Sequence, residues 1–167
     1  MASRRLRPIM KGSGLSKARI REEARDVPVF ADADVLVAGG GVAGCAAAVA
    51  AARAGARTVL VERNGCLGGV ATATMMANIG NRYMLSKGEQ TIHGIAAEVA
   101  DRLVEVGAAS PTWRRCKSIP MDSERLKVVL IEMLEEAGVT LLTHSMAAQP
   151  ILDDKTVNGC FFESKSG

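Results

Sequence analysis

A glycine-rich turn between an apolar run and an alanine-rich segment constrains the fold of this 167-residue chain more than any other feature. Residues 34–38 form a short apolar run rich in valine, which is typical of a buried parallel strand. Three glycines at 39–41 break the run, and residues 42–54 then have high helix propensity. Because residues 58–62 form a second apolar run, the sequence predicts a strand, a glycine turn, a helix and a second strand, which together make a βαβ unit.

The glycines satisfy the Gly-x-Gly-x-x-Gly pattern of dinucleotide-binding turns. Gly39 permits a tight turn out of the strand, Gly41 lets backbone N–H groups approach a pyrophosphate, and Gly44 allows close packing of the helix on the strand. The start of the helix offers unpaired N–H groups and a partial positive charge to phosphates. We therefore predict cofactor contacts from Val42 and Ala43 as well.

An acidic residue ends the second apolar run. Glu62 lies 23 residues after Gly39, close to the spacing of about 20 expected for the acid that binds ribose hydroxyls. The alternative interpretation is an exposed carboxylate at a strand end. The βαβ context favours nucleotide binding, although this context alone fits NAD as well as FAD.

The residues after Glu62 separate these two cofactors. The run DVLVAGGGVAGCAAAVAAARAGARTVLVERNGCLGGVATATM resembles FAD-dependent oxidoreductases of the glutathione-reductase-type fold. It is most similar to the FAD-dependent oxidoreductase family that includes flavoproteins resembling heterodisulfide reductase, in which a Glu-Arg-x-Gly-x-Leu-Gly-Gly-x-Ala-Thr pattern follows the second strand. The resemblance implies a noncovalent FAD as redox carrier. It implies cofactor contacts from Arg63, Gly68, Gly69 and Thr72 in this pattern, and from backbone near Ala147 at the adenine.

Regular elements are also expected after residue 72. The sequence predicts a helix from Ile92 to Gly107, an amphipathic helix from Asp122 to Gly138, a third parallel strand at 139–143 and a hairpin at 147–163, with irregular stretches at 63–91 and 108–121. The hairpin resembles the start of the family's β-meander. We therefore predict an α/β fold, namely a Rossmann-like FAD-binding domain with a parallel sheet and the start of a β-meander.

In the resembling family, the meander is followed by a strand with an Ala-Thr-Gly-Asp-like motif that completes the FAD site. This sequence ends at residues 164–167, where that strand is expected. The FAD-binding domain, 27–167, is therefore expected to be partial, incomplete at its C-terminus, and without the substrate domain. Two alternatives stay open at this point: an NAD(P)-binding dehydrogenase domain, and a truncated non-catalytic fragment.

Residues 1–26 are predicted to form a flexible basic arm. Residues 1–25 contain eight lysines and arginines against two glutamates, a local net charge of +6 in a chain whose formal net charge is +3. The basic charge therefore lies on the arm and not on the folded body. Without interleaved aromatic residues, a solvated tail is favoured over a nucleic-acid-binding arm. No run of about 18 apolar residues is present, so no membrane span is predicted.

The cysteines and histidines give no strong site. The four cysteines, Cys45, Cys66, Cys116 and Cys160, are widely separated, a spacing typical of neither a zinc site nor a 4Fe–4S cluster, although some relatives carry the latter. We predict no metal and a reducing, cytoplasmic setting. His93 is a weak candidate for acid–base chemistry, and His144 is assigned a structural role. The catalytic residues and the small-molecule substrate or electron partner are unknown at this level.

Overall fold

The computed structural model describes residues 24–80, 90–116 and 118–165. The chain divides into two compact units, Met1–Phe30 and Ala31–Gly167. In the first unit, residues 24–30 have no regular secondary structure and are exposed. Residues 1–23, which make up most of the predicted basic arm, lie outside the described residues, so the flexibility of this arm stays a prediction.

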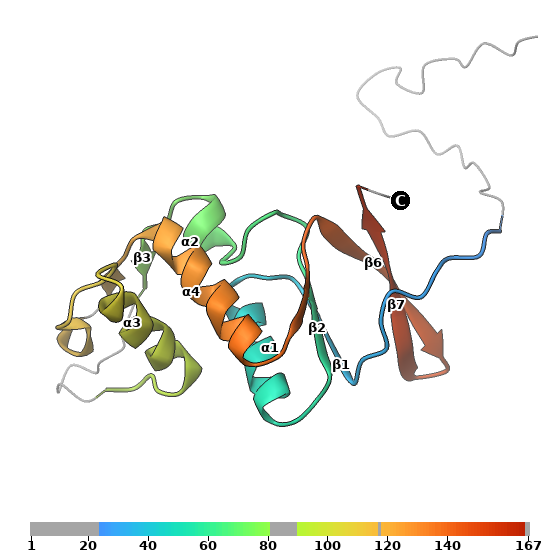
Figure 1. Ribbon diagram of the computed structural model, residues 1–167, viewed down its shortest axis with the longest axis horizontal. Coiled ribbons are helices and arrows are strands. Elements are labelled where there is room, and N and C mark those ends of the chain that lie inside the picture. Colours follow the sequence, from blue (N-terminus) through green and yellow to red (C-terminus); the bar gives the residue numbers. More distant parts are fainter. Residues whose placement is uncertain (1–23, 81–89, 117, 166–167) are drawn as a thin grey trace, which may run out of the picture. The chain divides into compact units, whose positions relative to one another are not determined.

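The second unit is built on a parallel sheet, seen edge-on near the middle of Figure 1. Among the described residues its strands are β1 (Val35–Ala38), β2 (Thr58–Val61) and β5 (Thr140–Leu142), in the order β1-β2-β5. β2 is central and buried along its whole length, as expected for a continuous apolar strand. Leu60 lies opposite Val37 on one side and Leu141 on the other. The predicted α/β fold with a parallel sheet is confirmed.

Two predicted helices share one core with the central strand. α1 (Val42–Arg53) contacts both β1 and β2, and it buries small side chains at Cys45 and Ala48. α4 (Ser123–Glu136) buries its apolar face in the same cluster, which also contains Leu60. The burial of this face follows from the helical spacing of its apolar residues, Leu126, Val129, Leu130, Met133 and Leu134.

The start of α4 is fixed by a capping side chain. The Asp122 carboxylate accepts hydrogen bonds from the backbone N–H groups of Glu124 at 2.8 Å and Arg125 at 3.2 Å. A cap of this kind satisfies N–H groups that have no partner within the helix.

None of the helices in the described part of the chain has the length and hydrophobicity of a membrane-spanning segment.

The stretches predicted to be irregular contain short regular elements. α2 (Val70–Ala73) and β3 (Asn78–Ile79) lie in the first stretch, and η1 (Trp113–Arg115) and β4 (Ile119–Pro120) lie in the second. β3 pairs with β4 in an antiparallel ladder. The prediction of two wholly irregular stretches is therefore wrong, because this pairing joins residues about 40 positions apart and leaves no local periodicity.

A second core cluster forms around Trp113, which is 1% exposed and packs with Ala100 and Ile119. Ala100 belongs to α3 (Ile95–Glu105), the helix predicted between Ile92 and Gly107. The Trp113 indole N–H donates to the Asp101 carboxylate at 2.9 Å, and the Arg114 guanidinium lies 4.5 Å from the Trp113 ring centroid. Trp113, which lies in the second of these stretches, is thus a core residue.

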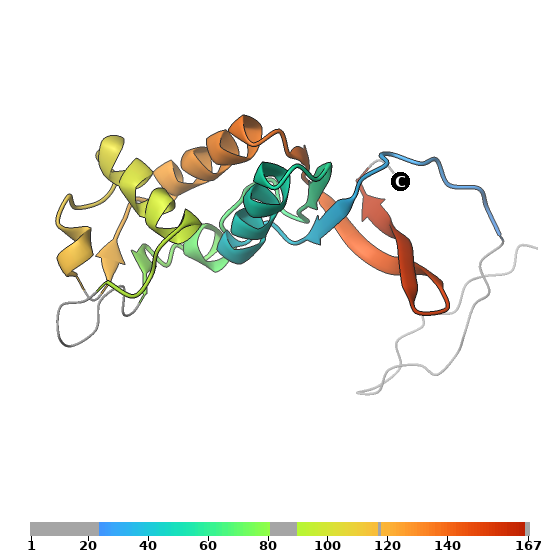
Figure 2. The same cartoon turned by 90° about the horizontal axis from the view of Figure 1, so that it is seen from below.

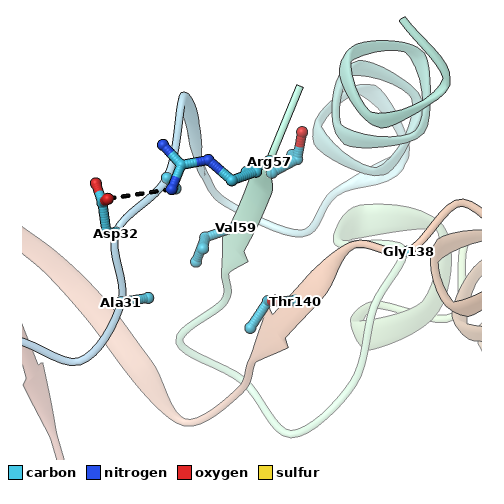
Figure 3. Close-up of a pocket in the computed structure, with 8 residues that line it drawn as sticks. Ala31, Asp32, Arg57, Val59, Gly138 and Thr140 are labelled. Atoms are coloured by element: carbon cyan, nitrogen blue, oxygen red, sulfur yellow. Dashed lines mark hydrogen bonds and ion pairs between the residues drawn. The ribbon is translucent and has the colours of Figure 1, made fainter. Parts of the chain in front are cut away.

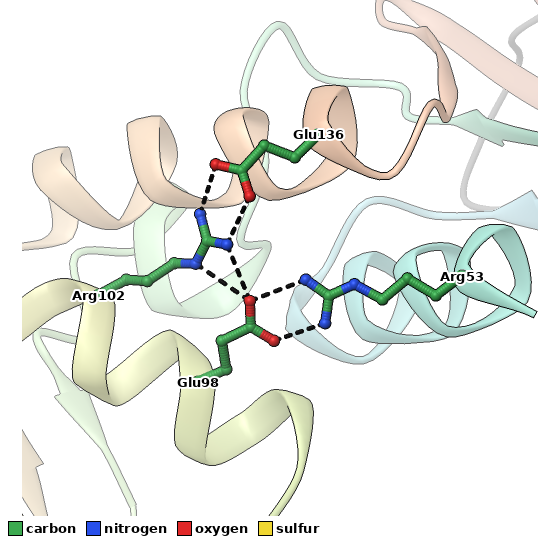
Figure 4. Close-up of polar contacts among 4 residues, drawn as sticks. All are labelled: Arg53, Glu98, Arg102 and Glu136. Atoms are coloured by element: carbon green, nitrogen blue, oxygen red, sulfur yellow. Dashed lines mark hydrogen bonds and ion pairs between the residues drawn. The ribbon is translucent and has the colours of Figure 1, made fainter.

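Charged residues join the three long helices (Figure 4). Glu98 of α3 accepts hydrogen bonds from Arg53 of α1 at 2.6 and 2.8 Å. Arg102, one turn further along α3, donates to Glu98 at 2.9 Å and to Glu136 of α4 at 2.7 Å. These paired charges hold α1, α3 and α4 together at their solvent side.

The predicted hairpin is present and longer than expected. β6 (Ser145–Asp153) and β7 (Thr156–Ser164) form a two-stranded antiparallel ribbon, which Figure 2 shows as two long twisted strands. Asp154 adopts a left-handed backbone conformation, with φ of 52°, in the turn between them. β6 begins directly after the third parallel strand, so its first residues lie at the carboxyl edge of the sheet.

Candidate functional site

The predicted glycine turn forms the link between β1 and α1. Gly39 has φ of 107°, a conformation that glycine adopts without strain, and its N–H still donates to Val61 at 2.8 Å. The chain then leaves the sheet and enters α1 through Gly41, the N-cap residue, where no side chain caps the helix. The first N–H groups of α1 are therefore left to a ligand or to solvent.

The glycines of this turn differ in the space around them. A Cβ on Gly44 would overlap the carbonyl oxygen of Gly39, so a glycine is required there for the helix to pack on the strand. A Cβ on Gly41 would meet no atom within 4 Å. The Cβ position of Gly41 therefore faces open space, which leaves room there for a bound molecule.

The second glycine pair packs directly against the first turn. The Gly68 N–H donates to the Gly40 carbonyl at 2.8 Å, and Gly41 and Gly68 form a parallel bridge. A Cβ on Gly69 would lie 3.1 Å from the Gly41 Cα. The structure thus brings together two segments that the sequence assigned separately to one site.

Thr72 supports this second turn from inside the protein. Its side chain is 2% exposed, and its hydroxyl donates to the Leu67 carbonyl at 2.5 Å. A Cβ on Gly68 would overlap the Thr72 methyl group. The threonine therefore lies under the turn, and its hydroxyl proton is bound within the chain.

Glu62 is buried at the end of β2, with an exposed fraction of 6%. Its carboxylate accepts hydrogen bonds from the N–H groups of Gly40 at 2.6 Å and of Asn64 at 2.7 Å. The alternative interpretation of Glu62 as an exposed carboxylate is therefore wrong. This carboxylate is fixed between the glycine turn and the loop that follows β2.

A surface hollow of about 210 Å³ lies beside this carboxylate. It is lined from three directions, by the end of β1, by Glu62 and Arg63 after β2, and by the start of β6 with Ser145 and Ala147. These segments meet at the carboxyl edge of the parallel strands, which is where open α/β sheets bind their ligands. The predicted residues Gly39, Glu62, Arg63 and Ala147 all line this hollow.

A second hollow, of about 280 Å³, lies at the opposite edge of the sheet (Figure 3). Arg57 reaches across it and forms ion pairs with Asp32 at 3.1 Å and Asp34 at 2.7 Å. The hydrogen bonds from Arg57 lower the pKa of Asp34 to about 2. None of the predicted site residues lines this hollow, and its charges are paired with each other.

Three residues help to shape the site although the sequence motifs do not specify them. Gly40 occupies a variable position of the glycine pattern, yet a Cβ there would lie 2.6 Å from Leu67 and 3.0 Å from Glu62. Ser145 is 2% exposed and donates its N–H to the Glu62 carbonyl at 3.0 Å. Asn64 supplies an N–H to the carboxylate, and only the folded loop reveals this.

His93 and Cys45, which sequence reasoning did not assign to the site, have different surroundings. His93 is exposed and its Nε2 lies 3.1 Å from the Gln90 carbonyl, whereas burial raises the pKa of the Cys45 thiol to about 11. All four cysteines are free thiols. In the described ranges, no group of three or more His, Cys, Asp or Glu side chains is arranged to hold a metal ion.

The fold and the two packed glycine segments define a nucleotide-binding α/β protein of the Rossmann type. The sequence model of the FAD dependent oxidoreductase family matches residues 34–167. The chain belongs to this family, whose cofactor is FAD.

Three solved structures of other proteins have a similar fold. THI4 from Thermovibrio ammonificans is 22% identical, with a TM-score of 0.54 over 80% of this chain and 48% of its own. The 3-ketosteroid-Δ4-(5α)-dehydrogenase from Rhodococcus jostii RHA1 is 20% identical, with a TM-score of 0.54 over 81% of this chain and 42% of its own. L-amino acid deaminase from Proteus vulgaris is 15% identical, with a TM-score of 0.54 over 85% of this chain and 46% of its own. The chain thus spans less than half the length of these proteins.

Proposed function

We propose that this chain binds FAD along the carboxyl edge of its sheet and serves as the cofactor-binding part of an oxidoreductase. The pyrophosphate would lie over the turn between Gly39 and Gly44, where α1 directs unpaired N–H groups outward. The observation that carries this proposal is the open face of Gly41, which packs against Gly69 on one side and leaves free space on the other. The contacts to the pyrophosphate would come from Gly39, Gly41, Val42, Ala43 and Gly44.

The adenosine half would occupy the hollow beside Glu62. A buried carboxylate held by two N–H groups keeps further lone pairs with which to accept ribose hydroxyls. Arg63 and the backbone of Ala147 line the same hollow and would contact the adenine ring.

The flavin half would extend past the second glycine pair. Gly68 and Gly69 pack on the first turn without side chains, so a flat ring could pass close to their backbone. Thr72 would support this turn from the protein interior through the hydrogen bond from its hydroxyl to the Leu67 carbonyl. When bound, FAD supplies the electron-transfer chemistry, and the residues of this chain bind and orient it.

A small-molecule substrate or an electron partner would meet the flavin beyond Gly69. We propose no nucleic acid partner. We propose a cytoplasmic location, because the widely separated cysteines of the sequence favour a reducing setting.

The absorbance of the purified chain distinguishes this function from its alternatives. After incubation with FAD and removal of free ligand, the protein should retain the visible absorbance of a flavin. A colourless protein that instead binds NADH would support a nicotinamide-dependent dehydrogenase. A folded protein that binds neither cofactor would support a non-catalytic binding module.

A further inference from the structure

The corner between β5 and β6 is fastened to the loop that carries Glu62. The His144 N–H donates to the Asn64 carbonyl at 3.2 Å, and the next N–H, that of Ser145, donates to the Glu62 carbonyl at 3.0 Å. Two successive N–H groups thus bind the same short loop. In an extended strand, successive N–H groups point in opposite directions.

The backbone of His144 explains this arrangement. Its φ is 54°, which makes it one of three non-glycine residues with positive φ in the described part of the chain. A left-handed residue within otherwise extended or right-handed chain turns neighbouring N–H groups toward one side. A side chain with a Cβ is disfavoured in this conformation, and such outliers are retained where the surroundings require them.

The side chain of His144 also lies against this loop. Its Cε1 and Nε2 atoms stand 2.6 Å from the position that a Cβ of Gly65 would take, although the residue as a whole is exposed. The imidazole ring therefore covers Gly65 on the outside of the loop. The backbone and the ring of one residue both contact residues 62–65.

The same loop sets the geometry of the hollow. The Asn64 N–H binds the Glu62 carboxylate at 2.7 Å, and the Asn64 carbonyl accepts from His144, so one residue links the corner to the carboxylate. Arg63 lies between them, and Ser145 forms the opposite wall. A change of backbone at His144 would release both walls of the hollow at once.

We propose that His144 is a positioning residue for the adenosine half of the cofactor site. Its left-handed backbone holds the loop of Glu62 and Arg63 at the rim of the hollow, so it acts on the cofactor through these residues. This inference rests on the proposed function.

The test uses substitutions that separate backbone from side chain. Valine, which is β-branched, is strongly disfavoured at positive φ, whereas asparagine tolerates it. His144→Val should raise the dissociation constant for FAD, measured by flavin fluorescence, about tenfold or more. His144→Asn should keep the FAD affinity of the unsubstituted chain.

Asp154→Val is the matched control, because Asp154 has φ of 52° in the hairpin turn and does not line the hollow. It should lower the thermal midpoint as His144→Val does and leave FAD affinity unchanged. If His144→Val does not fold, His144→Ala should show a smaller loss of affinity, about threefold, in the same direction. ADP, which carries the adenosine half alone, should lose affinity in parallel with FAD.

Unchanged FAD affinity in a folded His144→Val or His144→Ala variant would overturn the inference and leave the proposed function intact. An equal loss in His144→Asn would also overturn it, because the ring and not the backbone would then be responsible. Failure of the unsubstituted chain to bind FAD would contradict the proposed function itself, and the inference with it.

Discussion

The two edges of the parallel sheet each place a carboxylate near a hollow, and they hold it in different ways. At the amino edge, Asp34 is half-exposed and paired with the Arg57 guanidinium. At the carboxyl edge, Glu62 is buried and accepts hydrogen bonds from the backbone N–H groups of Gly40 and Asn64. Among the described residues, no cation pairs with Glu62.

This difference separates a structural carboxylate from a ligand-binding one. An arginine with a planar fork neutralises the charge of its partner carboxylate. Backbone N–H groups fix a carboxylate in place without neutralising it by a full charge, so lone pairs remain for hydroxyl groups of a ligand. The edge with the paired charges therefore stabilises the sheet, and the edge with the unpaired charge is suited to binding.

The largest effect on stability is expected at Gly44, where α1 packs closely on the turn that follows β1. Gly44→Ala would place a methyl group on the Gly39 carbonyl oxygen, and we expect a loss of about 3 kcal/mol in the free energy of unfolding. Urea denaturation followed by circular dichroism measures this loss. A variant as stable as the parent would mean that α1 does not pack on the turn as described.

The second-largest effect is expected for FAD affinity when Glu62 is replaced, and a variant of Asp34 gives the direct comparison. Glu62→Ala should weaken FAD binding by roughly 1.5–3 kcal/mol, the value of charge-assisted hydrogen bonds. Asp34→Asn should leave FAD affinity unchanged, because its carboxylate lies at the other edge and is paired with Arg57. Calorimetric titration of both variants measures the contrast. Equal losses of affinity would remove the distinction between the two edges.

The smallest effect concerns other carboxylates held by arginine. Hydrogen bonds from Arg53, with two further ones from Arg102, lower the pKa of Glu98 to about 2, and Arg102 also lowers the pKa of Glu136. A depressed pKa means that the stabilisation is fully present above the ordinary pKa of 4.5 and is lost as the pH falls from there toward 2.

The thermal midpoint measured between pH 6 and pH 2.5 tests this dependence. Arg102→Met should flatten part of the decline below pH 4.5, because the variant loses the main contact that lowers the pKa of Glu136 and the smaller contribution to that of Glu98, while Arg53 stays bound to Glu98. FAD affinity at neutral pH should not change, since the helix network lies outside the hollow. An unaltered acid profile would show that these pairs do not stabilise the fold.

Local signals in the sequence predicted the parts of the fold that are local in nature. The glycine turn, α1 and the capped helix α4 all follow from propensity, spacing and capping within short windows. The β3–β4 ladder and the burial of Trp113 depend on contacts between distant segments, so no periodicity indicated them. The helix α2 has only four residues, which are too few to show a helical period in the sequence.

The candidate site likewise contains residues that local sequence signals predict and residues that only the folded structure reveals. The glycine pattern and Glu62 stand in the sequence at recognisable spacing, and the resemblance to a flavoprotein family added Gly68 and Gly69. The bond from Gly40 to Glu62 and the left-handed corner at His144 could not be predicted, because they depend on how loops meet after folding. Function at this edge thus depends partly on residues that no motif contains.

The most direct test of the account is a titration of the chain and of its Gly41→Val variant with FAD. The valine side chain would enter the open space above the turn, where no atom of the protein lies within 4 Å of the added Cβ. We expect the parent to bind FAD. The variant should keep the thermal midpoint of the parent, while its affinity for FAD falls by about a hundredfold or more. Equal FAD affinity in the two proteins would contradict a cofactor site at the carboxyl edge of this sheet.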